Sequence, residues 1–130
     1  LHFDRLIPEI CKAIIKNEEL RIRSDGTFIR DYIYIKDVVN GYMVLLNNIE
    51  DIKGEAYNFS SLDSLSVLEV VGKVNSLIDK KLNYKIVNNS KNEIPYQHLD
   101  DSKIRSLGWK PTHSLVSTLK SIMKWYKSIL

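Results

Sequence analysis

The sequence has few cysteines and histidines, the residues that stabilise small secreted or metal-dependent proteins through disulfides and metal sites. Cys11 is the single cysteine among 130 residues, so one chain can build neither a disulfide framework nor a thiolate metal site. The three histidines, at positions 2, 98 and 113, show none of the spacings typical of metal ligands, and we predict no metal site. No apolar run approaches the ~20 residues needed to span a membrane, and the first residues do not resemble a signal peptide. We therefore expect a cytoplasmic protein.

Glycine is also scarce, and it is scattered. The five glycines stand at positions 26, 41, 54, 72 and 108. A dinucleotide-binding turn needs its glycines close together between a strand and a helix, so that the backbone can approach a pyrophosphate. No stretch of the sequence approaches that spacing, and we predict no NAD site within these residues.

Charge of either sign is moderate. The net charge is +3, and no basic run is interleaved with aromatic residues, which argues against a nucleic-acid partner. With 44% apolar and 27% charged residues, the composition is that of one ordinary globular domain. The sequence has no initial Met, and Pro8 opens a helix almost at once. We expect the chain to be a piece of a longer protein.

Three arginines gather on two predicted strands. Residues 24–26, Ser-Asp-Gly, are typical of a tight turn, and residues 28–35 are rich in the aromatic and β-branched side chains that suit a strand. Arg21 and Arg23 precede the turn and Arg30 follows it. Guanidinium groups clamp a phosphate at two points, so this corner can hold a phosphorylated ligand. The alternative is that these charges are solvated or paired within the protein.

Helical and extended patterns alternate along the rest of the chain. Pro8 favours the first turn of a helix that residues 17–19 end, and Asp37 is a candidate N-cap for a helix with a broad apolar stripe over residues 38–49. Further signals predict strands at 55–60 and 83–87, a loop at 88–97, and helices capped by Ser66, by Asp100 or Asp101, and by Ser114. The predicted class is an α/β or α+β piece with small mixed strands.

Several motifs resemble one enzyme family. Residues 25–37 read Asp-Gly-x-x-x-Arg-Asp-Tyr-Ile-Tyr-Ile-x-Asp and resemble the nucleotide-sugar-binding segment of the NAD-dependent sugar epimerases and dehydratases, which are extended short-chain dehydrogenases. The resemblance continues through residues 4–8, 54–59, 100–103 and 107–111, in the order of the family. Residues 93–100, Glu-Ile-Pro-Tyr-Gln-x-Leu-Asp, most resemble the CDP-glucose 4,6-dehydratase branch. The implied fold is the C-terminal part of a Rossmann-type enzyme.

This resemblance implies a substrate-binding set of five residues. Arg30 matches the arginine that binds the diphosphate of the nucleotide sugar, and Arg5 matches a position that faces the nucleotide. Arg23 stands where relatives carry Tyr or Phe beside the base, and its planar guanidinium can stack on a base instead. Glu93 and Gln97 match a loop that closes over the nucleotide, where Gln97 can read a cytosine edge. One departure is Ser90, at the place of a second phosphate-binding arginine in many relatives.

No catalytic residue is predicted. Tyr32 and Lys36 have the Tyr-x-x-x-Lys spacing of the family's catalytic pair, but that pair works only when it is stacked on a helix. In a strand the two residues lie about 13 Å apart along the axis. The resemblance places both residues in the nucleotide-binding segment, away from the catalytic helix. For residues 100–103 we prefer helix capping to a ligand role.

The resemblance implies a division of labour with a missing N-terminal domain. That domain would hold NAD, and residues 1–130 would form a single nucleotide-sugar-binding portion, with CDP-glucose the favoured ligand. The parent enzyme would be a nucleotide-sugar 4,6-dehydratase. A nucleotide-sugar 4-epimerase, and a stand-alone binding module without catalysis, are the alternatives. Without its partner domain the chain should expose apolar surface around Tyr32, Tyr34 and residues 38–49. It should then self-associate into homo-oligomers or rearrange its packing.

Overall fold

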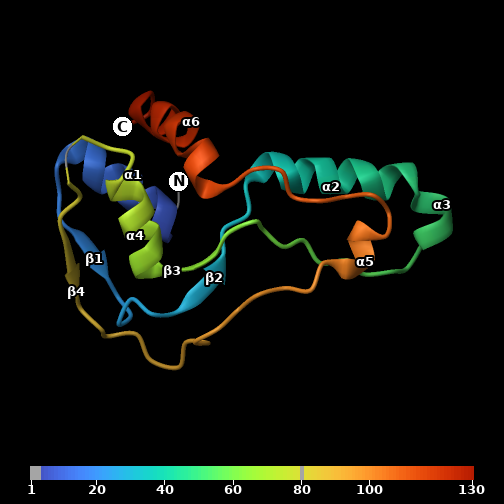
Figure 1. Ribbon diagram of the computed structural model, residues 1–130, viewed down its shortest axis with the longest axis horizontal. Helices are drawn as coiled ribbons and strands as arrows, with labels where there is room; N and C mark the ends of the chain where they lie inside the picture. The colour runs from blue at the N-terminus through green and yellow to red at the C-terminus, as the bar shows by residue number, and fades with distance from the viewer. Residues whose placement is uncertain (1–3, 80) are drawn as a thin grey trace.

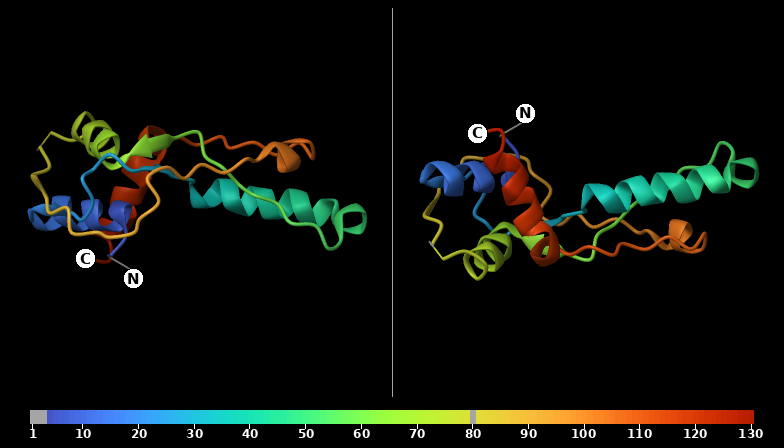
Figure 2. Two further views of the ribbon diagram at one scale, coloured as in Figure 1. Left: turned by 90° about the horizontal axis from the view of Figure 1, so that it is seen from below. Right: turned by 90° about the horizontal axis from the view of Figure 1, so that it is seen from above.

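The computed structural model describes residues 4–79 and 81–130, which form a compact lobe and an arm that projects from it (Figure 1). Both views in Figure 2 show the same division, with α1 and the C-terminus at the lobe. In chain order the elements are α1 (Leu6–Lys16), β1 (Leu20–Ile22), β2 (Ile29–Asp31), α2 (Ile35–Asn47), α3 (Ile49–Ile52), β3 (Ser64–Ser66), α4 (Val67–Asn75), β4 (Tyr84–Ile86), α5 (Ser102–Arg105) and α6 (Leu115–Lys127).

The lobe is built from α1, α4 and α6 packed with a two-stranded parallel sheet. In that sheet β1 pairs with β4, and Leu20 lies opposite Tyr84. The core is formed by apolar side chains of the three helices, of β1 and of the turn before β4, chiefly Ile10, Cys11, Ala13, Leu20, Ile22, Val70, Val71, Val74, Leu82, Leu115 and Leu119. Several helices with two small sheets make a mixed α/β architecture, as the sequence predicts.

The arm consists of α2 and α3 on one side and α5 on the other, with extended chain running between them (Figure 1). Its small interior contains Trp109 and Ile104, both buried. The Trp109 ring lies 5.3 Å from the ring of Phe59, between centroids, and Phe59 in turn contacts Gly41 of α2. Gly41 thus allows the Phe59 side chain to approach the helix closely.

A second small sheet joins the two parts. The strand β2 pairs antiparallel with β3, and Arg30 lies opposite Leu65. The two strands on either side of the 24–26 turn therefore pair with different partners and not with each other. Gly26 has φ +89°, and the Ser24 and Asp25 side chains accept hydrogen bonds from the N–H groups of Gly26 and Thr27. The tight turn is confirmed.

Local helix signals agree closely with the structure. Ser66 and Ser114 each form a complete capping box, the first with Glu69 and the second with Ser117. Pro8 lies in the first turn of α1, and Asn17 ends that helix in the left-handed conformation. At α5 the capping bond comes from Asp100, whose carboxylate accepts the Ser102 N–H. The neighbouring Asp101 bonds Ser60 and Arg105 instead.

Two predicted strands are shorter or absent. Residues 28–35 give only the strand Ile29–Asp31, because α2 begins at Ile35. Residues 55–60 form no strand: a strand needs a neighbour to complete its hydrogen-bond ladder, and no described strand pairs with this segment. It is held by side chains instead, since Lys103 Nζ donates to Glu55 and to the Ala56 carbonyl. Among the described residues no helix is long and apolar enough to cross a membrane.

Candidate phosphate-binding cleft

A cleft of about 470 Å³ lies where the start of α1, the β1–β2 corner and the loop before α5 meet. It brings together four of the five predicted binding residues, Arg5, Arg23, Arg30 and Glu93. Its full lining is Asp4, Arg5, Leu6, Glu9, Arg21, Ile22, Arg23, Ser24, Arg30, Val67 and Glu93. Four guanidinium groups against three carboxylates leave the cleft cationic, which suits an anionic ligand.

Arg30 is oriented by several neighbours. Its Nη1 donates a 2.8 Å hydrogen bond to the Ile29 carbonyl, and its Nη2 lies 3.5 Å from Glu93 Oε2. The guanidinium carbon is 5.8 Å from the centre of the Phe28 ring. The side chain is about a quarter exposed. Among the described Lys and Arg side chains that form ion pairs, Arg30 is the least exposed. It still lines the cleft.

Arg23 is held by Asp4 and by Glu9 of α1. Its Nη2 donates to the Asp4 carbonyl and lies 4.0 Å from Glu9. A second cleft of about 390 Å³ adjoins the first and shares Asp4, Glu9, Arg21 and Arg23 with it. Val87 and Asn89 complete that second lining. Arg21 lines both clefts, and the sequence placed it in the arginine corner without including it among the binding residues.

Gln97 does not line the cleft. Its backbone N–H donates to the Ile29 carbonyl, and its side chain is exposed. Ser90, which stands where relatives carry a second arginine, donates its backbone N–H to the Arg23 carbonyl. The loop 88–97 is thus anchored on β1 and β2 through backbone bonds, and it approaches the cleft through Glu93.

Tyr32 and Lys36 do not form a helical pair. Tyr32 follows β2, whereas Lys36 lies in the first turn of α2. Burial raises the pKa of Tyr32 to about 12, and the nearby Arg30 only partly opposes this shift. A general acid or base is most effective when its pKa is near the working pH. The environment of Tyr32 instead moves its pKa further from neutral pH.

The described residues do not fit NAD. Gly26, Gly54 and Gly108 have positive φ, but each serves a separate turn, and Gly41 and Gly72 lie within helices. None of them opens a strand-to-helix connection of the kind that receives a pyrophosphate.

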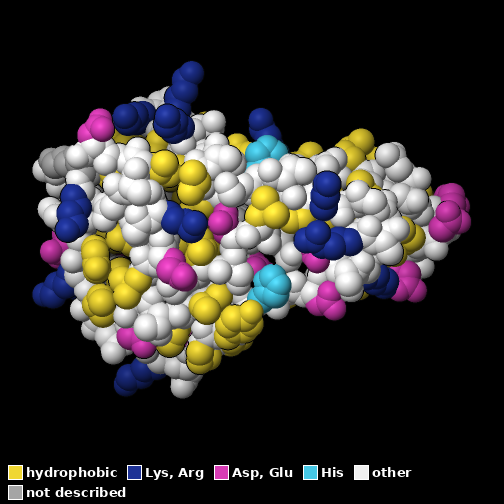
Figure 3. Space-filling view, in the orientation of Figure 1, with side chains coloured by type: hydrophobic (Ala, Val, Ile, Leu, Met, Phe, Trp, Pro, Cys, Tyr) yellow, Lys and Arg dark blue, Asp and Glu magenta, His cyan; other side chains and the backbone are white. Residues whose placement is uncertain are grey.

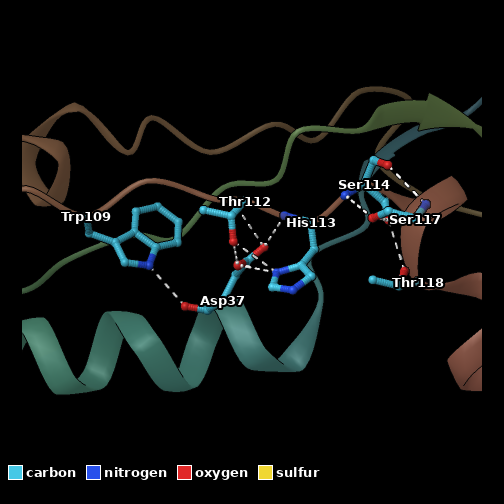
Figure 4. A network of polar contacts seen from close by, with 7 residues as sticks. All are labelled: Asp37, Trp109, Thr112, His113, Ser114, Ser117 and Thr118. Carbon is cyan, nitrogen blue, oxygen red and sulfur yellow. Dashed lines mark hydrogen bonds and ion pairs between the residues drawn. The ribbon is translucent and has the colours of Figure 1, made fainter.

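Asp37 has a role that differs from the prediction. It does not cap α2, which starts two residues earlier, after Tyr34. Its carboxylate is buried and accepts hydrogen bonds from the backbone N–H groups of Thr112 and His113 and from the Thr112 hydroxyl, and it lies 2.7 Å from His113 Nδ1 (Figure 4). The Asp37 carbonyl also accepts the Trp109 indole N–H. Asp37 therefore ties the chain before α6 to the start of α2.

The environment of Asp37 keeps its carboxylate ionised. Burial raises its pKa, but hydrogen bonds from His113 and Thr112 outweigh burial and leave the pKa below its usual value. The Tyr34 ring covers His113, with 5.1 Å between ring centroids. Sequence reasoning missed this network, because its partners are 75 and 76 residues away from Asp37.

One face of α2 is bare. Asp37 and Gly41 lie on the buried face of the helix. Six apolar side chains of α2 and the start of α3 are between 44% and 64% exposed: Ile35, Val39, Tyr42, Met43, Leu46 and Ile49. We call this set the α2 stripe. Figure 3 shows hydrophobic side chains at the surface of the arm as well as of the lobe. A stripe of this kind is typical of a face that packs on another protein surface.

Residues 2–60 match the model of the "NAD dependent epimerase/dehydratase family". The chain is 34% identical over 104 residues to a UDP-glucose 4-epimerase of Dictyostelium discoideum, with 78% of this chain and 30% of that protein covered. It is 32% identical over 132 residues to a CDP-glucose 4,6-dehydratase of Salmonella typhimurium, with 96% and 36% covered.

Solved structures give a parallel result. The fold matches UDP-glucuronic acid 4-epimerase from Bacillus cereus, solved with UDP-glucuronic acid and NAD, at a TM-score of 0.91 and 25% identity. That match covers 98% of this chain and 41% of the epimerase. The chain therefore spans well under half the length of the relatives that it matches.

Proposed function

On the premise of the NAD-dependent epimerase/dehydratase family, which these comparisons support, we propose that the chain is the nucleotide-sugar-binding portion of an NAD-dependent enzyme. In this proposal residues 1–130 form one substrate-binding unit, and the natural polypeptide also carries an N-terminal domain that binds NAD. NAD-bound structures among the similar proteins support that cofactor for the parent protein.

The cationic cleft is the observation that carries this proposal. Arg5, Arg21, Arg23 and Arg30 all line it. A diphosphate carries negative charge on two adjacent phosphoryl groups, and guanidinium forks can bind each of them at two points. Arg30 would take one phosphoryl group, while Arg23, facing the adjoining cleft, would lie against the base.

The finer proposal is a CDP-glucose 4,6-dehydratase, acting in the synthesis of cell-surface sugars. Residues 93–100 and the relative from Salmonella typhimurium support this branch. Glu93 already lies at the cleft, beside Arg30. Gln97 lies in the same loop but outside the cleft lining, and its exposed amide both donates and accepts, as the reading of a cytosine edge requires.

A UDP-sugar 4-epimerase is the second candidate. The relative from Dictyostelium discoideum and the epimerase from Bacillus cereus favour it. A stand-alone binding module is the third, because the described residues contain neither a dinucleotide turn nor a stacked Tyr–Lys pair.

The α2 stripe supports the need for a second domain. Six exposed apolar side chains on one helical face cost free energy in water, at roughly 25 cal/mol for each Å² that stays unburied. Residues 55–60, extended and without a strand partner, lie in the same arm. We propose that the NAD-binding domain covers the α2 stripe and pairs with this segment. The chain alone would then bind a nucleotide sugar weakly and catalyse nothing, since ligand sites are usually enclosed on most sides.

Turnover by the full-length protein tests the proposal. Mass spectrometry of the product from CDP-glucose should show loss of water, as a 4-keto-6-deoxy sugar requires. A product of unchanged mass with inverted C4 would favour the epimerase. Competition between CDP, dTDP, UDP and GDP then identifies the base, and preference for UDP or dTDP would refute the CDP assignment. No turnover of any nucleotide sugar, with no domain upstream of residue 1, would leave only the binding module.

A further inference from the structure

A third hollow lies on the lobe, where α1, α6 and the segment just after α4 meet. It is an open groove of about 530 Å³. Its apolar lining is Ile14, Leu77, Ile78, Leu119 and Met123, and its charged rim is Lys120, Lys124, Lys127 and Asp79. None of these residues belongs to the phosphate-binding cleft, so the groove is separate from the proposed substrate site.

The lysines form a row along one side of α6. Lys120, Lys124 and Lys127 are spaced four and three residues apart, which places them on one helical face over about 10 Å. All three are exposed, and among residues 4–79 and 81–130 none forms an ion pair with a carboxylate. Figure 3 shows basic side chains gathered over the α6 end of the lobe.

The helix dipole explains only part of this row. Lys124 and Lys127 lie in the last turn of α6, where cations offset the partial negative charge of the helix end. Lys120 lies a turn earlier and gains little from that effect. Lys120 instead extends the row of lysines along the rim of the groove, next to its apolar lining.

We propose that this groove is a docking site for an acidic amphipathic helix of a partner protein. A furrow between helices accepts the apolar ridge of another helix, and carboxylates at matching spacing on that helix would pair with the three lysines. Methionine, here Met123, adapts to the shape of a partner side chain. An open groove favours a helix over a small amphiphile, because a small ligand needs most of its surface buried.

Two synthetic peptides of ~18 residues test this in the full-length protein, one with leucine and glutamate faces and the other with every glutamate replaced by lysine. The acidic peptide should bind and should shift the methyl NMR signal of Met123, which Met123→Leu assigns. The signal of Met43, on the α2 stripe, should not move. Raising the salt concentration should weaken binding, since the lysines are exposed.

Matched variants locate the contact. Lys120→Glu/Lys124→Glu should weaken acidic-peptide binding by about tenfold or more, and Lys120→Gln/Lys124→Gln by less. Lys36→Glu/Lys110→Glu makes the same charge change away from the groove and should have little effect. Equal binding of both peptides, insensitivity to the groove variants, or a shift of Met43 without Met123 would each overturn the proposal. So would sodium laurate shifting Met123 where the acidic peptide does not.

Discussion

The guanidinium of Arg30 lies 3.5 Å from the carboxylate of Glu93, so one ion pair joins β2 to the loop at the edge of the cleft. A second bond, to the Ile29 carbonyl, fixes the orientation of the same fork. An anionic ligand would meet a preoriented arginine and would replace or share the Glu93 contact. On the proposed function, such a ligand would compete with Glu93 for Arg30.

Arg30→Lys tests whether the fork matters beyond its charge. Lysine keeps the cation but loses two-point contact with a phosphoryl group, so nucleotide-sugar affinity of the full-length protein should fall about tenfold. Calorimetric titration measures this. Arg105→Lys, on α5 and away from both clefts, serves as the control and should bind normally. Unchanged affinity in Arg30→Lys would show that Arg30 does not bind the diphosphate.

Gly41→Ala should destabilise the arm. A β-carbon on Gly41 would lie 2.4 Å from the Phe59 Cε1 atom, so the ring must move and the packing of Trp109 with it. Overpacking of this kind costs about 1–3 kcal/mol of unfolding free energy. Gly72→Ala is the matched control, because Gly72 also lies inside a helix and its added β-carbon meets nothing within 4 Å.

For Gly72→Ala the expected sign is opposite. Alanine loses less backbone entropy than glycine on entering a helix, so this variant should gain about 0.5–1 kcal/mol. Urea denaturation of both variants compares the two effects in one experiment. Equal stability of the two would mean that Phe59 does not pack against Gly41 in solution.

Asp37→Asn should lower stability at neutral pH by about 3 kcal/mol, because an amide cannot accept the whole set of donors that the buried carboxylate satisfies. The folded-state pKa of Asp37 is below its ordinary value. Its stabilising contribution is therefore complete above that ordinary value and is lost as the pH falls through the lowered one.

The pH dependence separates this residue from other carboxylates. Thermal unfolding of the wild type between pH 7 and pH 2 should include an acid loss that Asp37→Asn lacks. Asp79→Asn, at an exposed position, should change stability by no more than about 0.5 kcal/mol. An Asp37→Asn protein as stable as the wild type would contradict the assigned role.

The α2 stripe should make the 130-residue chain associate with itself. Val39→Glu/Leu46→Glu places two charges on the stripe, where apolar contact between copies would bury them, so it should shift sedimentation toward the monomer. Val116→Glu charges an exposed apolar position on α6 and should leave association unchanged. A wild-type chain that stays monomeric at high concentration would refute the expected association.

Sequence predicts the local elements of this fold well. The capping boxes at Ser66 and Ser114, the turn at Gly26 and the end of α1 before residues 17–19 depend on neighbours within a few residues, and all are present. The strand predicted at residues 55–60 is absent, because a strand depends on distant rather than local partners. Tyr57 and Phe59 suit a strand, but strand formation depends on a partner that no described segment provides.

The candidate cleft could be anticipated only in part. Motif resemblance selected Arg5, Arg23, Arg30 and Glu93, which the fold brings together from three separate segments. Arg21 was left out because the resemblance gave it no role, although alternation along β1 places it on the same exposed side as Arg23. Asp37 was misassigned because a buried carboxylate with distant partners has the same local sequence as a helix cap.

The two tryptophans of the chain report on different parts of the molecule. Trp109 is 2% exposed and is enclosed in the arm between Phe59 and the start of α2, whereas Trp125 is 51% exposed on α6 of the lobe. Their indole rings thus emit from an apolar and an aqueous environment. Fluorescence can therefore distinguish a loosening of the arm from a melting of the lobe, without any added label.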